Sequence, residues 1–306
     1  MIPQKNISLI SNSLYQAISK IGKTRARRIP EGVIERDYVL AWFLMALAKH
    51  PVLSTALAFK GGTALRRIHF GEYRFSEDLD FSLTRPIEMV DLNKHFREVF
   101  LEVESLAGIK FSMDEAKTTN HLRNDTLFFD YKGPLPAMAS VKVDVSREEV
   151  IVFPLESKPV LKTYPEYVDF PDVQAGLQVY SFNEIVVEKT LAVTDNARRE
   201  PRDLYDLWFI LSEGHVLYPA ELVAGLNLKL ASRAGRENDV LAPRLEKVKS
   251  SLKSSWEKRL GVQVEMLPVF DDCYRTVHKL MNEFDACRLM EFQQNEGKDT
   301  FIRPRP

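Results

Sequence analysis

The spacing of apolar residues predicts alternating helices and strands in the first half of the chain. Apolar positions three and four residues apart predict an amphipathic helix over 7–21 and a strongly apolar helix over 34–49, which Pro51 ends. Short apolar or alternating runs predict strands over 57–60, 78–83, 127–131 and 141–145. Further helices are predicted over 63–70 and 90–106. These elements indicate a domain of the α/β (α+β) class.

The pattern changes near residue 150. Prolines interrupt the extended pieces between 151 and 178, as is typical of sheet edges and linkers: Pro154, Pro159, Pro165 and Pro171. Helical periodicity then dominates, with helices predicted over 183–196, 204–212, 220–230, 238–259 and 268–294. We therefore expect an α/β domain over 1–178, followed by a mostly α-helical domain over 179–306.

The composition of the chain excludes two classes of protein, disordered chains and proteins with a membrane-spanning helix. An apolar share of 45% and a charged share of 28% exclude a disordered chain. The longest apolar run, 39–48, is too short to cross a bilayer, which takes about 20 residues. No signal peptide opens the sequence, and Cys273 and Cys287 form no ligand cluster. We expect a cytoplasmic protein that has no membrane partner and is a monomer.

The net charge of −1 hides two basic blocks. Residues 1–36 carry seven basic residues against two acidic ones, and residues 229–259 carry nine against four, so each block has a net charge of +5. Blocks of this kind can follow a nucleic-acid backbone. The alternative is that each is an ordinary solvated helix face.

Two aspartates on one predicted strand are the strongest chemical feature. Asp78 and Asp80 are two residues apart, so their side chains leave the same face of the strand while Leu79 and Phe81 face the core. Two carboxylates on one side of a buried strand repel each other, and a divalent cation relieves that repulsion. Oxygen ligands favour Mg²⁺ or Mn²⁺ over zinc.

A glycine turn precedes this pair. Lys60-Gly61-Gly62-Thr63 joins a predicted strand to a predicted helix, and glycines there let backbone amides approach an anion. The Thr63 hydroxyl could add a phosphate contact. A tight turn with glycines at positive φ is the plain structural alternative.

A third carboxylate lies on a later strand. In Val141-Lys142-Val143-Asp144-Val145, Asp144 shares a face with Lys142 opposite three valines. An acid there holds a metal or pairs with a base such as Lys142. An anion-binding turn, an aspartate pair and a third acid together indicate phosphoryl or nucleotidyl transfer with bound cations.

The segments KGGTAL (60–65) and RFSEDLDFSL (74–83) resemble the bacterial AbiEii-type nucleotidyltransferase toxins of the DNA polymerase β-like superfamily. Asp144 matches that superfamily's later single aspartate. In the second half, Glu188-Lys189 and Pro201-Arg202-Asp203-Leu204-Tyr205-Asp206-Leu207 resemble the family's helical lysine and Arg-Asp-x-x-Asp element. The matches span about 59–207.

The resemblance implies a nucleotidyltransferase domain with a small mixed sheet flanked by helices. It implies that Asp78, Asp80 and Asp144 hold Mg²⁺ or Mn²⁺ and are catalytic, together with Lys189 and Asp206. It further implies that an NTP substrate is bound by Lys60, Gly61, Gly62, Thr63, Ser76, Lys189, Arg202 and Asp203. The sequence leaves open whether Asp203 or Asp206 lies at the active site, and whether Lys189 instead extends to solvent.

The family also suggests an acceptor and a partner. It implies transfer to RNA, specifically to the 3′ end of tRNA, and hence a block of translation. It implies a cognate antitoxin from a neighbouring gene, in a type IV or phage-defence module. Two alternatives stay open: the same chemistry on a protein or small-molecule hydroxyl, and a nucleotide-binding module without catalysis.

Overall fold

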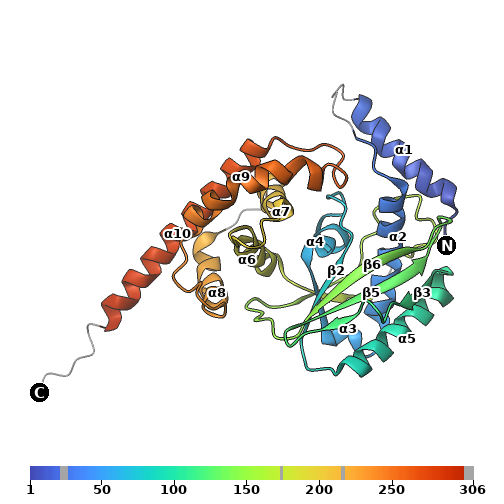
Figure 1. The fold of residues 1–306 in the computed structure, drawn as a ribbon, viewed down its shortest axis with the longest axis horizontal. Helices are drawn as coiled ribbons and strands as arrows, with labels where there is room; N and C mark the ends of the chain where they lie inside the picture. The colour runs from blue at the N-terminus through green and yellow to red at the C-terminus, as the bar shows by residue number, and fades with distance from the viewer. Residues whose placement is uncertain (21–26, 173–174, 215–217, 300–306) are drawn as a thin grey trace, which may run out of the picture. The chain divides into compact units, whose positions relative to one another are not determined.

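The computed structural model of the protein describes residues 1–20, 27–172, 175–214 and 218–299. The chain forms two compact units, whose elements are labelled in Figure 1. The sheet unit comprises Met1–Glu149, Pro154–Ser181 and Gly261–Met266. The helical unit comprises Val150–Phe153, Phe182–Leu260 and Leu267–Pro306. The chain therefore passes between the units several times, and each unit is assembled from separate stretches of sequence.

The helices of the sheet unit follow the apolar periodicity of the sequence. They are α1 (Gln4–Lys20), α2 (Glu31–Lys49), α3 (Leu53–Ala56), α4 (Gly61–Ala64), η1 (Leu65–Phe70) and α5 (Met89–Ala107). The helices predicted over 34–49 and 90–106 correspond to α2 and α5. The helix predicted over 63–70 begins earlier, at Gly61, and becomes a π-helix at Leu65.

A single mixed sheet forms the centre of this unit. Its strands are β1 (Leu57–Lys60), β2 (Leu79–Leu83), β3 (Lys110–Met113), β4 (Thr119–Asn120), β5 (Asn124–Lys132), β6 (Ala139–Ser146), β7 (Glu156–Lys158) and β8 (Leu177–Val179). The order is β3-β5-β6-β2-β1-β8-β7, with β4 paired to β5. Strand β2 is parallel to β6 and antiparallel to β1. Sequence reasoning missed β3 and β4, which are short; β3 is partly exposed and β4 is exposed.

One face of the sheet forms the core of the unit. Helices α2 and α5 pack there (Figure 1), where the ring of Phe43 lies 6.2 Å from that of Phe96 and 5.8 Å from that of Phe129. Leu79 and Phe81 of β2 are fully buried, as the alternation of the sequence predicts. The other face carries Asp80, Lys142 and Asp144, because successive side chains on a strand point to opposite sides.

A fully buried ion cluster involves two arginines of the π-helix. Asp37 of α2 accepts from Arg66 Nε at 2.6 Å and lies 3.0 Å from Arg67 Nη2. Burial raises the pKa of the Asp37 carboxyl, but the two guanidinium groups outweigh it and hold that pKa below its usual value. The N–H of Gly71 donates to the carbonyl of Arg66 at 2.9 Å, which is the wide π-type turn. This turn lets both arginines reach one carboxylate.

The helical unit contains the five helices that the sequence predicts. They are α6 (Phe182–Val193), α7 (Pro201–Ser212), α8 (Pro219–Ala231), α9 (Leu241–Leu260) and α10 (Phe270–Asp299). Pro201 and Pro219 occupy first-turn positions, where a missing N–H costs nothing. Within the described residues, no helix combines the length and the apolar content that a membrane span requires.

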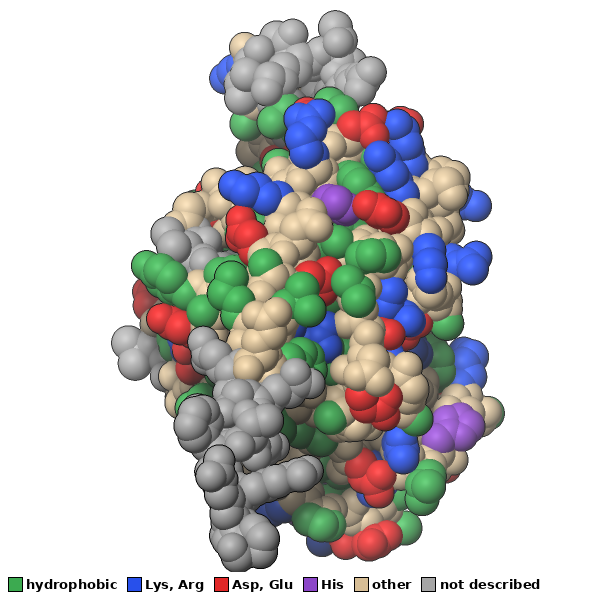
Figure 2. Space-filling view, turned by 90° about the vertical axis from the view of Figure 1, so that its left-hand side faces the viewer, with side chains coloured by type: hydrophobic (Ala, Val, Ile, Leu, Met, Phe, Trp, Pro, Cys, Tyr) green, Lys and Arg blue, Asp and Glu red, His purple; other side chains and the backbone are tan. Residues whose placement is uncertain are grey.

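The C-terminal basic block has an internal role in part. Lys229 is 1% exposed, lies 2.6 Å from Glu184 Oε1 and also pairs with Glu188. Arg236 and Arg244 both bind Asp239, at 2.6 and 2.8 Å. These residues hold the helical unit together. Others of the block are exposed, including Lys247, Lys258 and Arg259. On the face that Figure 2 draws, basic and acidic side chains are interspersed.

The N-terminal basic block is also partly engaged. Arg28 donates to the Ser11 hydroxyl at 3.2 Å, and Arg36 pairs with Glu77 at 2.6 Å. Lys23 and Arg25 lie outside the described residues. A continuous phosphate-binding arm therefore remains a hypothesis from the sequence.

Candidate active site

The glycine turn lies directly against one of the predicted metal ligands. Gly61 has φ +81°, a conformation that glycine adopts without strain. A Cβ atom at Gly61 would collide with the carboxylate of Asp80 and lie 3.1 Å from its Cβ. The turn thus needs glycine for two reasons, its backbone conformation and the closeness of Asp80.

The same turn is tied to Asp78. The hydroxyl of Thr63, which is 1% exposed, donates to the backbone carbonyl of Asp78 at 2.5 Å. This bond fixes the turn to the residue that precedes β2, and the phosphate contact of Thr63 stays a prediction. Sequence reasoning missed this bond because the two residues are brought together only by the fold of the loop between them.

Strand register brings three predicted site residues side by side. Lys60 of β1 is opposite Asp80 of β2, and Asp80 is opposite Asp144 of β6. Neighbouring strands are about 4.8 Å apart, so side chains in register on one face are immediate neighbours. Asp78, Asp80 and Asp144 are half-buried. Carboxylates from two strands thus face the same region beside the glycine turn.

Asp144 is already neutralised by a cation of the protein itself. Lys142 Nζ lies 2.6 Å from Asp144 Oδ2, and the Thr126 hydroxyl donates to Asp144 Oδ1 at 2.6 Å. The pairing with Lys142 is the alternative that the sequence leaves open for this acid. Because carboxylates supply only oxygen ligands, the residues fit Mg²⁺ or Mn²⁺.

Lys60 is anchored at the edge of this group. Its Nζ donates to Ser146 Oγ at 3.0 Å and lies 3.2 Å from Glu149 Oε2. It also lies 5.6 Å from the centre of the Tyr180 ring. These contacts direct the Lys60 ammonium group toward Ser146 and Glu149, while the backbone of Lys60 is in register with Asp80.

Lys189, Asp203 and Asp206 form one cluster in the helical unit. Lys189 Nζ lies 2.7 Å from Asp203 Oδ1 and 2.7 Å from Asp206 Oδ2, and Arg198 also pairs with Asp203. Lys189 therefore does not extend to solvent, and both acids share it. Burial raises the pKa of Asp203, but Lys189 and Arg198 outweigh it and lower that pKa overall. Arg202 lies outside this cluster and pairs with Glu200 at 3.2 Å.

Replacing Lys189 by methionine is expected to destabilise the protein by about 3–5 kcal/mol, because two buried carboxylates lose their shared partner. Urea titration at neutral pH measures this loss. Asp203 has a lower pKa in the folded protein than in the unfolded chain, so its ionised form stabilises the fold at pH values above the unfolded-state pKa. This stabilisation is lost as the pH falls through the folded-state pKa. The difference between the two proteins should therefore shrink below about pH 4. Lys258→Met, at an exposed lysine of α9, is the control, and an equal loss there would contradict the assignment.

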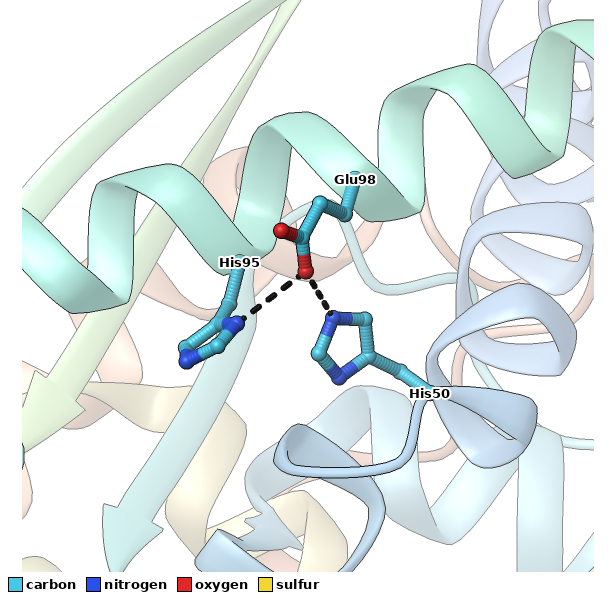
Figure 3. A group of neighbouring side chains, drawn as sticks. All are labelled: His50, His95 and Glu98. Carbon is cyan, nitrogen blue, oxygen red and sulfur yellow. Dashed lines mark hydrogen bonds and ion pairs between the residues drawn. The ribbon is translucent and has the colours of Figure 1, made fainter.

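Another group resembles a metal site in its spacing. Within the described residues, three ligand atoms come within 4.8 Å of one another only at His50, His95 and Glu98, which Figure 3 shows. The three aspartates are more widely spaced. However, His50 Nδ1 accepts the N–H groups of Val52 and Leu53 at 3.1 and 3.0 Å.

That capping role decides the chemistry of His50. A nitrogen that accepts two N–H groups carries no proton, so the proton of the neutral ring is on Nε2, which donates to Glu98 at 2.9 Å. A metal bound at Nε2 would require the ring proton to be on Nδ1, where it would face the N–H groups of Val52 and Leu53. The group therefore links the end of α2 to α5 and does not suit a metal ion.

Two residues at the site, Arg74 and Thr126, were given no role by sequence reasoning. Arg74 fills the space beside Gly62, where an added Cβ would lie 3.1 Å from its Cζ atom. Ser76, predicted to bind the nucleotide, borders the same space, with its Oγ 3.0 Å from that Cβ position. Arg74 is the first residue of the second motif segment, RFSEDLDFSL (74–83), so its place in the motif was the available signal. For Thr126 the sequence carries no comparable signal.

Comparisons with known proteins identify the family of the chain. The family model for "Nucleotidyl transferase AbiEii toxin, Type IV TA system" matches residues 42–276. The fold is similar to that of MenT4, a nucleotidyltransferase toxin from Mycobacterium tuberculosis H37Rv, with a TM-score of 0.57 and 22% identity over 97% of this chain and 99% of that one. Because only 22% of the aligned residues are identical, this similarity shows a shared fold and nothing more. No curated protein matches the sequence. Since the family model covers well over half of the chain, the chain belongs to the AbiEii family of nucleotidyltransferase toxins of type IV toxin–antitoxin systems.

Proposed function

We propose that this nucleotidyltransferase uses Asp78, Asp80 and Asp144 to hold Mg²⁺, or Mn²⁺, and moves a nucleotide from an NTP to an RNA hydroxyl. One observation carries the proposal. Asp80 and Asp144 are in register on neighbouring parallel strands, and Asp80 lies against a turn that requires glycine. An arrangement of this kind places carboxylate-bound cations next to backbone amides that can hold phosphate.

Each part of the site has a task in this reaction. The amides of Gly61 and Gly62 and the ammonium of Lys60 bind the triphosphate, and Ser76 borders the same turn. The cation, when bound, polarises the phosphate and lowers the pKa of the attacking hydroxyl. We expect it to compete with Lys142 for Asp144, because both carry positive charge to the same oxygens.

The family motif gives the cluster of Lys189, Asp203 and Asp206 a role in the proposed reaction. Lys189 and Asp206 match the lysine and the last acid of that motif, and Asp203 shares the same ammonium. We assign Lys189 and Asp206 to catalysis, and Asp203 and Arg202 to nucleotide binding, on that resemblance.

The proposed acceptor is the 3′ end of tRNA, so that transfer blocks translation. Exposed basic residues support a nucleic acid as acceptor, among them Lys247, Lys258 and Arg259 of α9. The type IV toxin–antitoxin family supports a cognate antitoxin as a second partner. Both assignments rest on the family and on charge.

The experiment offers purified protein Mg²⁺, each of the four α-labelled NTPs and total tRNA. We expect label to enter RNA with one preferred NTP, and chelation by EDTA to stop the reaction. Total cell protein and a low-molecular-weight extract serve as rival acceptors. Label in either of these, with none in RNA, would replace the acceptor proposed here. Binding of NTP without transfer to any acceptor would favour a non-catalytic module.

A further inference from the structure

The connection between α9 and α10 has an unexpected place in the fold. Both helices belong to the helical unit, yet Gly261–Met266 between them belongs to the sheet unit. Gln263 and Val264 in this segment are each 5% exposed. The segment is therefore built into the sheet unit, although the residues directly before and after it in the sequence belong to the helical unit.

The segment binds the chain just before the aspartate pair. The N–H of Phe75 donates to the Gln263 carbonyl at 2.7 Å. Arg74 Nη1 donates to the Gln263 side-chain oxygen at 3.2 Å and to the Phe75 carbonyl at 3.3 Å. A single residue thus fixes both the backbone and the arginine side chain at this point.

The Arg74 side chain connects Gln263 to the glycine turn. The guanidinium group lies where a side chain at Gly62 would begin, with Cζ 3.1 Å from that Cβ position. Arg74 is 3% exposed, and its guanidinium also lies 5.5 Å from the centre of the Tyr73 ring. A cation held beside the turn adds positive charge where the proposed function places phosphate.

We propose that Gln263 is a positioning residue, which holds the Arg74 guanidinium at the glycine turn and thereby strengthens NTP binding. The inference rests on the proposed function. Arginine has a long side chain with large rotamer entropy, so an orientation fixed before binding saves part of the entropy lost on binding. Gln263 contributes that orientation without contacting the nucleotide.

The test measures the initial rate against NTP concentration for Gln263→Leu, which removes the side-chain acceptor and leaves the backbone bond to Phe75 available. We expect KM for the NTP to rise about tenfold, as for a lost hydrogen bond to a charged group, with kcat changed much less. Val262→Ala, at the adjacent residue that is 49% exposed, is the matched control and should behave as wild type.

A double-mutant cycle asks whether Gln263 acts through Arg74. Arg74→Leu should raise KM as well, and adding Gln263→Leu to it should raise KM little further. Independent, multiplying effects would overturn the inference. So would a Gln263→Leu protein that is only less heat-stable, with an unchanged KM.

A direct binding measurement separates this inference from the proposed function. Calorimetry with a non-transferable NTP analogue and Mg²⁺ should show weaker binding to Gln263→Leu than to wild type. If wild type binds the analogue and the variant binds it equally well, the positioning role is wrong and the proposed function stands. If wild type binds no analogue, the proposed function is wrong, and the inference fails with it.

Discussion

Replacing Asp80 by asparagine is expected to lower the rate of nucleotide transfer roughly a thousandfold, because it removes a charge from the proposed cation site. Asparagine keeps the size of the side chain and one oxygen. The fold should therefore survive, since Asp80 is half-buried on the polar face of β2 and its neighbours Leu79 and Phe81 still form the core. The measurement is label incorporation from the preferred NTP, with the Mg²⁺ concentration for half-maximal rate determined in parallel.

A control for this variant is present in the same sheet. Asp130→Asn changes a half-buried aspartate on β5, which faces the same side of the sheet as Asp144 but is in register with Ser140. It should leave transfer within about twofold of wild type, as is usual for changes away from the reacting groups. If Asp80→Asn kept more than a tenth of the wild-type rate, Asp80 would not be a metal ligand.

Replacing Gly61 by alanine is expected to lower transfer about a hundredfold, because the new Cβ displaces the carboxylate that the reaction uses. The added atom would lie 3.0 Å from Asp80 Cγ and still closer to a carboxylate oxygen, so the Asp80 side chain must move. Small displacements of catalytic groups cost rates of this order. The positive φ adds about 1–2 kcal/mol of backbone strain, which urea titration measures separately.

Gly108→Ala isolates the strain from the displacement. Gly108 also has positive φ, at +68°, and an added Cβ there meets no atom within 4 Å. We expect this variant to lose similar stability and to retain its transfer rate. Equal losses of transfer in the two variants would mean that strain alone, and not the position of Asp80, explains the effect at Gly61.

Much of the fold could be predicted from local patterns. The apolar periodicity predicted α2, α5 and the helices of the helical unit, and short apolar or alternating runs predicted β1, β2, β5 and β6. These elements depend on side chains a few residues apart, which a sequence displays directly. The edge strands β3 and β4 were missed because they contain only four and two residues, too few for a periodic pattern to stand out.

In the candidate site, the directions of side chains on the strands could be predicted from the sequence, whereas their contact partners could not. The alternation of β2 predicted the face that carries Asp80, and the valines around Asp144 predicted its orientation. The strand was predicted from Asp78 but begins at Leu79, so the shared face of Asp78 and Asp80 stays a prediction. The partners of these acids were less predictable: the sequence left open whether Lys142 pairs with Asp144, and the structure shows that it does. The bond of the Thr63 hydroxyl to the Asp78 carbonyl was not predicted, and the phosphate contact of this residue stays a prediction.

The sequence by itself determined the family, the glycine turn and the face of each strand that carries an acid. Tertiary structure alone decided which strands are neighbours, and so that Asp80 lies in register with Asp144. It also decided that Lys189 is shared by Asp203 and Asp206, and that Gln263 reaches Arg74. Periodicity fixes a side chain's direction within its own element, whereas contacts between distant residues depend on how separate elements pack and pair.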